Sequence, residues 1–327
     1  MLRDTLHPDN ITCNGPRAVE PYPARIEAIV TERRTLMDES RNASIDCIIR
    51  RPASAATAAL PVVINSLPAP WRATEPSVSM SHVTRYLAAA GYAVVDVYHR
   101  SGDKRLFPVL AGEARGKGDY LRTRIADITS HHHRFLDIAM LIERLADLSS
   151  GGALKGPMDM SRIGIGGHSL GALTALSLGG LRWPPAFESY RHPGIKAAIL
   201  YSNALQRSLA SKTMMSGLSV PCLHMTGTRD RSIDGREGWR EKLLAYHMAP
   251  SGDQYALILR GADHQTFGGQ RADQLLANRR EELCHQFIRC ASLAFWDAYL
   301  KNSPQARDWL RHRLPSALGR DGSLEFR

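Results

Sequence analysis

The chain has 327 residues, of which 43% are hydrophobic and 23% charged, which is enough apolar material for a sizeable core. This composition excludes disorder for most of the chain, and no stretch approaches the ~18 uninterrupted apolar residues of a membrane-spanning helix. The formal net charge is +10, from 42 Lys and Arg against 32 Asp and Glu. The basic residues are spread out without a long run, so we interpret them as a solvated surface rather than a nucleic-acid site.

The cysteines and histidines give no sign of a metal site or a disulfide framework. The five cysteines include no C-x-x-C pair, which suits free thiols in a reducing compartment. Residues 131–133 are consecutive histidines, but neighbours on a helix diverge by ~100° and cannot converge on one ion. Residues 1–10 contain no apolar stretch like that of a signal peptide. We therefore expect a cytoplasmic location, although an exported protein without its leader would look the same.

The N-terminal half begins with a proline-rich leader and continues with strands and one helix. Residues 1–25 carry four prolines and are predicted to be irregular. The elements predicted after this leader are strands at 26–36 and 45–50 around a polar turn, a buried strand at 60–66 (LPVVINS), a helix at 80–90 closed by Gly91, and a strand at 92–98 (YAVVDVY).

The C-terminal half alternates strands and helices. A polar, glycine-rich excursion is predicted at 99–120. The elements predicted beyond it are a helix at 123–147, a strand at 162–166, a helix at 170–178, strands at 197–201, 221–226 and 255–259, and a helix at 272–300. The alternation predicts an α/β fold with a doubly wound, mostly parallel sheet and antiparallel N-terminal edge strands. We expect residues 26–327 to form a single domain.

The most informative segment is RIGIGGHSLGALTAL, residues 162–176. It contains a G-x-S-x-G motif, Gly167 to Gly171, between a predicted strand and a predicted helix. Chain reversal within two or three residues forces a strained turn, and the flanking glycines remove side chains that would clash there. Ser169 is thereby exposed at the carboxyl edge of the sheet, next to free N–H groups of the helix. The motif in this setting predicts that Ser169 is a catalytic nucleophile.

A serine hydroxyl needs a base and an orienting acid, and both follow later strands. Asp230 comes after PCLHMTGT, and His264 comes after YALILRGAD. Because parallel strands end at the same edge of a sheet, both side chains are expected beside Ser169. Asp234 lies further from its strand and is the weaker candidate for the acid. Asp263 is interpreted as loop structure.

An oxyanion hole requires two backbone donors. One is expected to be the N–H of Leu170, directly after the nucleophile. The second should come from the loop after LPVVINS, where we favour Ala69 and place Leu67 second, since the intervening prolines have no N–H. Candidate residues for the substrate pocket or its border are Leu67, Trp71, His168 and Trp183. Of these, His168 is expected to face away from the pocket and support the turn.

At these motifs the chain resembles the α/β-hydrolases of the serine esterase type. More narrowly, it is similar to the bacterial predicted dienelactone hydrolases and the related platelet-activating-factor acetylhydrolase group. The resemblance covers residues 26–312 and implies that Ser169, Asp230 and His264 are nucleophile, acid and base, with Ala69 and Leu170 forming the oxyanion hole. Dienelactone hydrolases use a cysteine nucleophile, so Ser169 favours ester hydrolysis over lactone opening. The group commonly carries His-Gly where this chain has Leu67-Pro68.

The sequence therefore predicts a hydrolase of carboxylic esters that needs no metal or cofactor and acts on a small-molecule ester. Alternatives that use the same triad are acyl transfer, thioester cleavage and polyester hydrolysis. A non-catalytic binding module and a nucleic-acid protein are more distant alternatives. The arginines between residues 100 and 124 would favour anionic esters if they lie near the site.

Overall fold

The computed structural model describes residues 22–54, 59–68, 79–99, 128–151, 156–232, 234–269, 271 and 278–327. The strands of these ranges are β1 (Ile29–Asp38), β2 (Ala43–Pro52), β3 (Leu60–Ser66), β4 (Ala93–Tyr98), β5 (Met158–His168), β6 (Arg182–Trp183), β7 (Glu188–Ser189), β8 (Ile195–Tyr201), β9 (Cys222–Gly227), β10 (Gln254–Leu259) and β11 (Gly322–Phe326). The helices are α1 (Ser81–Ala89), α4 (Thr129–Ser150), α5 (Leu170–Gly179), α6 (Lys212–Met215), α7 (Trp239–Lys242), α8 (Leu244–Met248), α9 (His264–Gly268), α11 (Arg279–Leu300), α12 (Pro304–Asp308), the π-helix η3 (Trp309–Arg313) and α13 (Leu314–Leu318). No helix in these ranges is long and apolar enough to cross a membrane.

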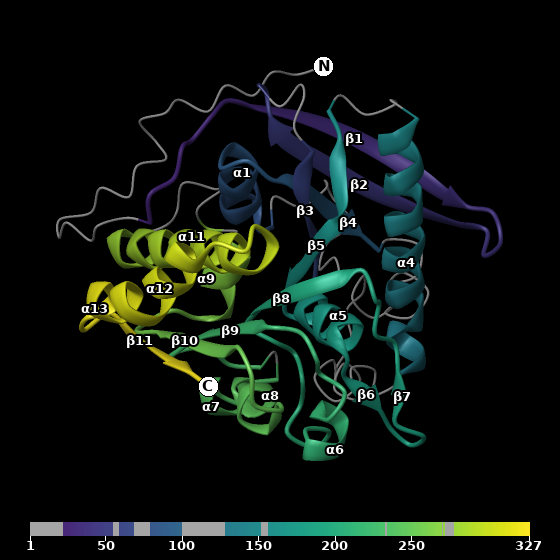
Figure 1. The fold of residues 1–327 in the computed structure, drawn as a ribbon. Coiled ribbons are helices and arrows are strands. Elements are labelled where there is room, and N and C mark those ends of the chain that lie inside the picture. The colour runs from purple at the N-terminus through teal and green to yellow at the C-terminus, as the bar shows by residue number, and fades with distance from the viewer. Residues whose placement is uncertain are drawn as a thin grey trace.

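A nine-stranded sheet runs through the molecule in the order β1-β2-β4-β3-β5-β8-β9-β10-β11 (Figure 1). The strands from β4 to β10 pair in parallel, whereas β1, β2 and β11 pair antiparallel at the two edges. The predicted α/β class, the mostly parallel sheet and the antiparallel N-terminal edge are confirmed. Because the parallel strands share one direction, the residues that follow β5, β8, β9 and β10 lie along one edge.

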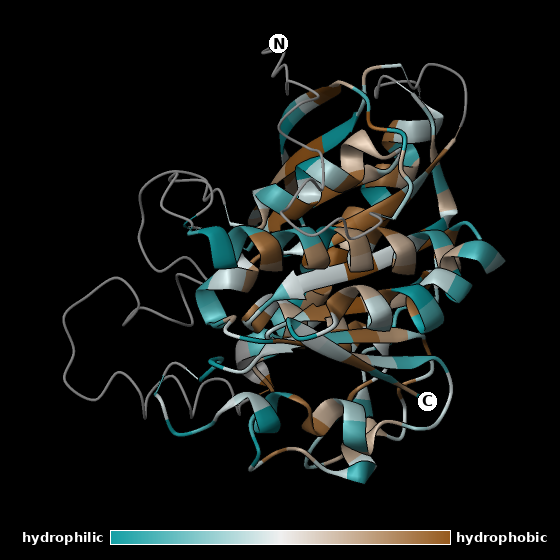
Figure 2. Cartoon of the chain, turned by 90° about the vertical axis from the view of Figure 1, so that its left-hand side faces the viewer, coloured by the Kyte–Doolittle hydropathy of each residue, from teal (hydrophilic) through white to brown (hydrophobic). Residues whose placement is uncertain are grey.

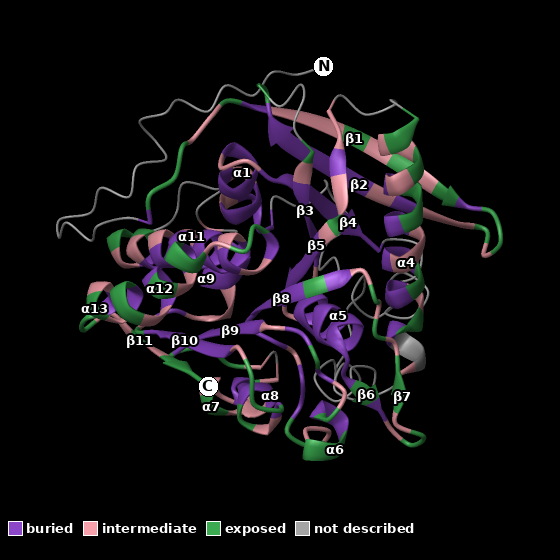
Figure 3. Ribbon diagram, viewed as in Figure 1, coloured by how far each residue is buried: buried purple, intermediate pink, exposed green. Residues whose placement is uncertain are grey.

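Helices cover both faces of this sheet, as Figure 1 shows for α1 and α11 on one side and α4 and α5 on the other. The side chains of β8 alternate between two hydrophobic cores, one on each face of the sheet. Ile199 and Tyr201 pack in the cluster that includes α11, whereas Ala198 and Leu200 pack in the cluster that includes α5. Apolar residues gather on the strands and the inner helix faces (Figure 2), and exposed residues lie on the outer faces (Figure 3). The sheet is thus a rigid support for the loops at its edge.

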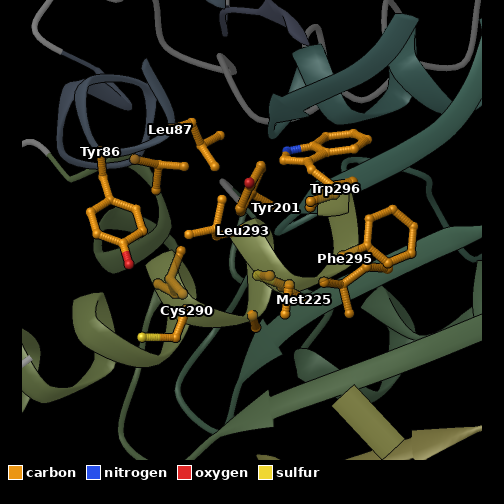
Figure 4. Packing of buried hydrophobic residues seen from close by; sticks show 14 of the residues in the cluster. Tyr86, Leu87, Tyr201, Met225, Cys290, Leu293, Phe295 and Trp296 are labelled. Atoms are coloured by element: carbon orange, nitrogen blue, oxygen red, sulfur yellow. The ribbon is translucent and has the colours of Figure 1, made fainter. Parts of the chain in front are cut away.

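Trp296 packs directly under the strand that leads to the predicted nucleophile. Its ring lies in the cluster shown in Figure 4, together with Tyr201 and Leu293. A Cβ atom added at Gly164 would approach the Trp296 ring to 2.5 Å, so the glycine makes room for the indole. The Tyr201 hydroxyl is 2.8 Å from Ser292 Oγ on α11. These contacts fix β5 and β8 against α11 immediately below the candidate site.

Several predicted elements differ from those observed. β3 has the predicted bounds, and Gly91 has the positive φ of 96° expected of a residue that ends a helix. β5 begins at Met158, four residues before the predicted start. β11, the short helix α9 and the helices after residue 303 were not predicted as elements. Most of the predicted leader and most of the 99–120 excursion lie outside the described residues.

Candidate active site

Ser169 stands on a strained turn between β5 and α5. Its φ is 57° and its ψ is −115°, a backbone conformation that costs a non-glycine residue of order 1–3 kcal/mol. Its backbone N–H donates to the Tyr201 carbonyl at 3.0 Å, and its carbonyl accepts from Ala172 and Leu173. The turn is therefore held both by the neighbouring strand β8 and by the first turn of α5.

The glycines of the motif are required by close approach of the backbone. A Cβ atom on Gly171 would overlap the Ser66 carbonyl oxygen, and one on Gly167 would overlap the backbone of Gly171. The predicted reason for the two flanking glycines is confirmed. The same close approach brings the end of β3 against the turn that carries Ser169.

The two expected oxyanion donors lie at the start of α5 and after β3. Leu170 is the first residue of α5, where backbone N–H groups have no partner within the helix. The N–H of Leu67, which was the alternative to Ala69 for the second donor, instead donates to the Val97 carbonyl at 3.2 Å. Its carbonyl accepts from Arg134 Nη1 at 2.9 Å, and its side chain is only 2% exposed in the core. Ala69 lies outside the described residues.

Asp230 and His264 come together at the edge of the sheet. Asp230 follows β9 and is 1% exposed, and His264 is the first residue of α9, shortly after β10. Asp230 Oδ1 lies 3.5 Å from His264 Nδ1, and Oδ2 accepts from Thr226 Oγ1 at 2.9 Å. Asp234 Oδ1 instead accepts from the backbone N–H of Arg236 at 3.1 Å.

Asp263 has the structural role predicted for it. Its Oδ1 accepts from the backbone N–H of Thr266 at 2.9 Å and caps the N-terminus of α9. It also forms an ion pair with Arg271 at 2.7 Å. These contacts position α9 and therefore its first residue, His264.

The surroundings of Asp230 keep its carboxyl group ionised. Burial raises the pKa of Asp230, but the neighbouring His264 imidazole and the positive charge of Lys242 outweigh this effect, so the pKa lies below its ordinary value. Lys242 is itself buried and donates from Nζ to the Asn203 carbonyl at 2.8 Å. A buried carboxylate beside an imidazole can stabilise the imidazolium that forms when the ring takes a proton.

His168 joins the turn of Ser169 to the loop of His264. Its ring centroid lies 4.5 Å from that of His264, and its Nε2–H donates to the His264 carbonyl at 2.9 Å. Because the His168 side chain is buried, it supports both segments and does not line an open pocket. No hydrogen bond joins Ser169 Oγ to the His264 ring among the described residues. Such bonds often tighten only when substrate binds.

The predicted pocket residues are only partly described. Trp183 is 1% exposed, and its indole N–H donates to Ser177 Oγ at 3.0 Å, so it belongs to the core and not to an open pocket wall. Trp71 and the arginines from 100 to 124 lie outside the described residues. A cavity of about 600 Å³ lies beside α7 and α8, with Arg207, Trp239 and His247 in its lining, and it includes none of the predicted catalytic residues.

Sequence reasoning missed Ser202, which follows β8 directly. Its Oγ lies 2.6 Å from His264 Nδ1, closer than Asp230 Oδ1 at 3.5 Å. Ser202 is buried and has a positive φ of 47°. The signal that points to it is its place after the strand IKAAILY, at the same edge of the sheet as Ser169.

A scan against protein-family models and a search of curated proteins both found no match. The geometry of the site therefore carries the functional argument.

A buried histidine behind α9 predicts a pH dependence of stability. Burial lowers the pKa of His285 to about 4, despite the hydrogen bond that its Nε2–H donates to the Thr266 carbonyl. Between pH 4 and the ordinary histidine value of ~6.5, the unfolded chain binds more protons than the folded chain. The free energy of unfolding is therefore not reduced by His285 above pH ~6.5. At pH 5, the neutral buried imidazole is expected to lower it by about 2 kcal/mol.

This expectation is tested by urea unfolding of the wild type and of His285→Gln between pH 5 and pH 7. The glutamine keeps a donor for Thr266 but does not titrate, so the dependence of unfolding free energy on pH should become shallower. His312→Gln is the matched control, because the His312 side chain is 67% exposed. An equal slope in wild type and His285→Gln would contradict the prediction.

Proposed function

We propose that the protein is a carboxylic-ester hydrolase of the α/β-hydrolase type, with Ser169, His264 and Asp230 as its triad. The observation that carries the proposal is the convergence of three strand ends. Ser169 follows β5 on a strained turn, and the Asp230–His264 pair follows β9 and β10 at the same edge. The chain order serine, acid, histidine and the strand–turn–helix setting of G-x-S-x-G are typical of α/β-hydrolases.

In the proposed mechanism, Ser169 Oγ attacks the ester carbonyl while His264 Nε2 takes the hydroxyl proton. The Asp230 carboxylate stabilises the resulting imidazolium, and its lowered pKa keeps it ionised for this role. The N–H of Leu170 stabilises the oxyanion at the start of α5. The imidazolium then protonates the leaving alcohol, and a water molecule, activated by the same imidazole, releases the acid and regenerates Ser169.

The proposal is tested by hydrolysis of p-nitrophenyl acetate, butyrate and octanoate together with labelling by a fluorophosphonate. We expect turnover of at least one ester and one covalent label per chain, located by peptide mass spectrometry on Ser169. Product analysis with an added alcohol separates hydrolysis from acyl transfer. The absence of both turnover and label in the folded protein would contradict the proposal.

A further inference from the structure

The nearest side chain to His264 Nδ1 is a serine rather than the predicted acid. Ser202 Oγ lies 2.6 Å from Nδ1, within hydrogen-bond distance, whereas Asp230 Oδ1 lies 3.5 Å from the same nitrogen. Asp230 Oδ1 is buried and has no hydrogen-bond partner of its own. The imidazole therefore contacts the hydroxyl more closely than the carboxylate.

The position of Ser202 is fixed from two sides. Its backbone N–H donates to the Met225 carbonyl on β9 at 2.9 Å. The carbonyl of the next residue, Asn203, accepts from the buried Lys242. Ser202 is 0% exposed, so no bulk water competes for its hydroxyl. The hydroxyl is consequently held at the edge of β8 against His264 Nδ1.

The backbone of Ser202 has a positive φ, which is uncommon for a residue other than glycine. Its φ of 47° is one that glycine adopts freely and other residues adopt at a cost. A glycine at this position would relieve the cost but would remove the hydroxyl that contacts His264.

The charge of Asp230 decides the direction of the hydrogen bonds. The buried Asp230 carboxylate lies 3.5 Å from His264 Nδ1, and its negative charge favours a proton on that nitrogen. The Nδ1–H is then donated to Ser202 Oγ, which lies 2.6 Å away. With the proton on Nδ1, the lone pair of Nε2 is free to accept a proton from Ser169.

We propose that Ser202 is a positioning residue whose hydroxyl accepts the Nδ1–H of His264 and holds the imidazole in the tautomer with a free Nε2. The catalytic role that this inference gives to Ser202 rests on the proposed function. The placement of the proton can be observed without any substrate. Ser202 does not touch the reacting atoms and acts only through His264.

Two variants at this position separate the hydroxyl from the backbone. Ser202→Ala and Ser202→Gly both remove the hydroxyl that contacts His264, and only glycine relieves the positive φ. We expect kcat for p-nitrophenyl acetate to fall by about 10- to 100-fold in both, with KM changed less than about twofold. Asn302→Gly is the control for strain relief alone, since Asn302 is exposed with a φ of 54° and lies after α11. Its kcat should equal that of the wild type.

The tautomer is measured by ¹⁵N NMR of labelled histidines, with His264→Gln used to assign the His264 signals. The wild type should show the Nδ1–H form of His264, and both Ser202 variants should show a mixture of tautomers. Wild-type kcat and an unchanged His264 spectrum in both variants would overturn the inference, as would recovery of kcat in Ser202→Gly. If the Ser202 variants change the His264 spectrum but the wild type hydrolyses no ester, the result would support the hydrogen bond from His264 to Ser202 and contradict the proposed function.

Discussion

Replacing Ser169 by alanine is expected to lower kcat for p-nitrophenyl acetate by about 10⁴-fold or more and to abolish labelling by a fluorophosphonate. Alanine has no oxygen to form the acyl-enzyme, so neither His264 nor the N–H of Leu170 can compensate. The fold should persist, because no side-chain hydrogen bond of Ser169 holds the described structure together. Alanine also adopts the φ of 57° at a cost similar to that of serine.

The measurement is a progress curve at high enzyme concentration, with unfolding followed by circular dichroism. Ser216→Ala provides the matched control, since Ser216 is an exposed serine at the end of α6. That variant should keep wild-type turnover and one label per chain. Residual turnover in Ser169→Ala above one tenth of wild type, with contaminating esterase excluded by purification, would contradict the assignment of Ser169.

Much of the fold follows from local sequence patterns. The strand LPVVINS and the helix after G-x-S-x-G were predicted because buried parallel strands are short and apolar and the motif marks a chain reversal. β11 was missed because its five residues include exposed positions and pair only at the sheet edge. The start of β5 was placed too late because its first four residues, MDMS, form no continuous apolar run and its register shifts there. Tertiary pairing, which single-sequence patterns do not contain, sets these boundaries.

The site was predicted to the extent that it depends on strand ends. Asp230 and His264 were expected together because both follow parallel strands, and the structure brings them to one edge. The sequence did not show that the N–H of Leu67, the alternative to Ala69, continues the pairing of β3 with β4 beyond the last strand residue. Ser202 was missed because a lone serine after a strand carries no motif. Only its distance from His264 distinguishes it from other serines.

The substitution Gly171→Ala is expected to destabilise the protein by about 3 kcal/mol or more and to reduce ester hydrolysis strongly. A Cβ atom at this position would overlap the Ser66 carbonyl oxygen, which belongs to the backbone of β3 and cannot rotate away. Either β3 or α5 must therefore move. Since Ser169 and the N–H of Leu170 lie immediately before Gly171, the displacement also disturbs the proposed oxyanion site.

Gly166→Ala on the same motif-bearing strand is the matched control. A Cβ atom there would lie 3.4 Å from the Ile199 carbonyl oxygen and 3.5 Å from the Tyr201 ring, both ordinary contact distances. Its unfolding free energy, measured by urea denaturation, should change by less than about 1 kcal/mol. Equal stabilities for the two variants would show that β3 and the turn separate easily. In that case the close approach of Ser66 to Gly171 would not be what holds Ser169 in its strained conformation.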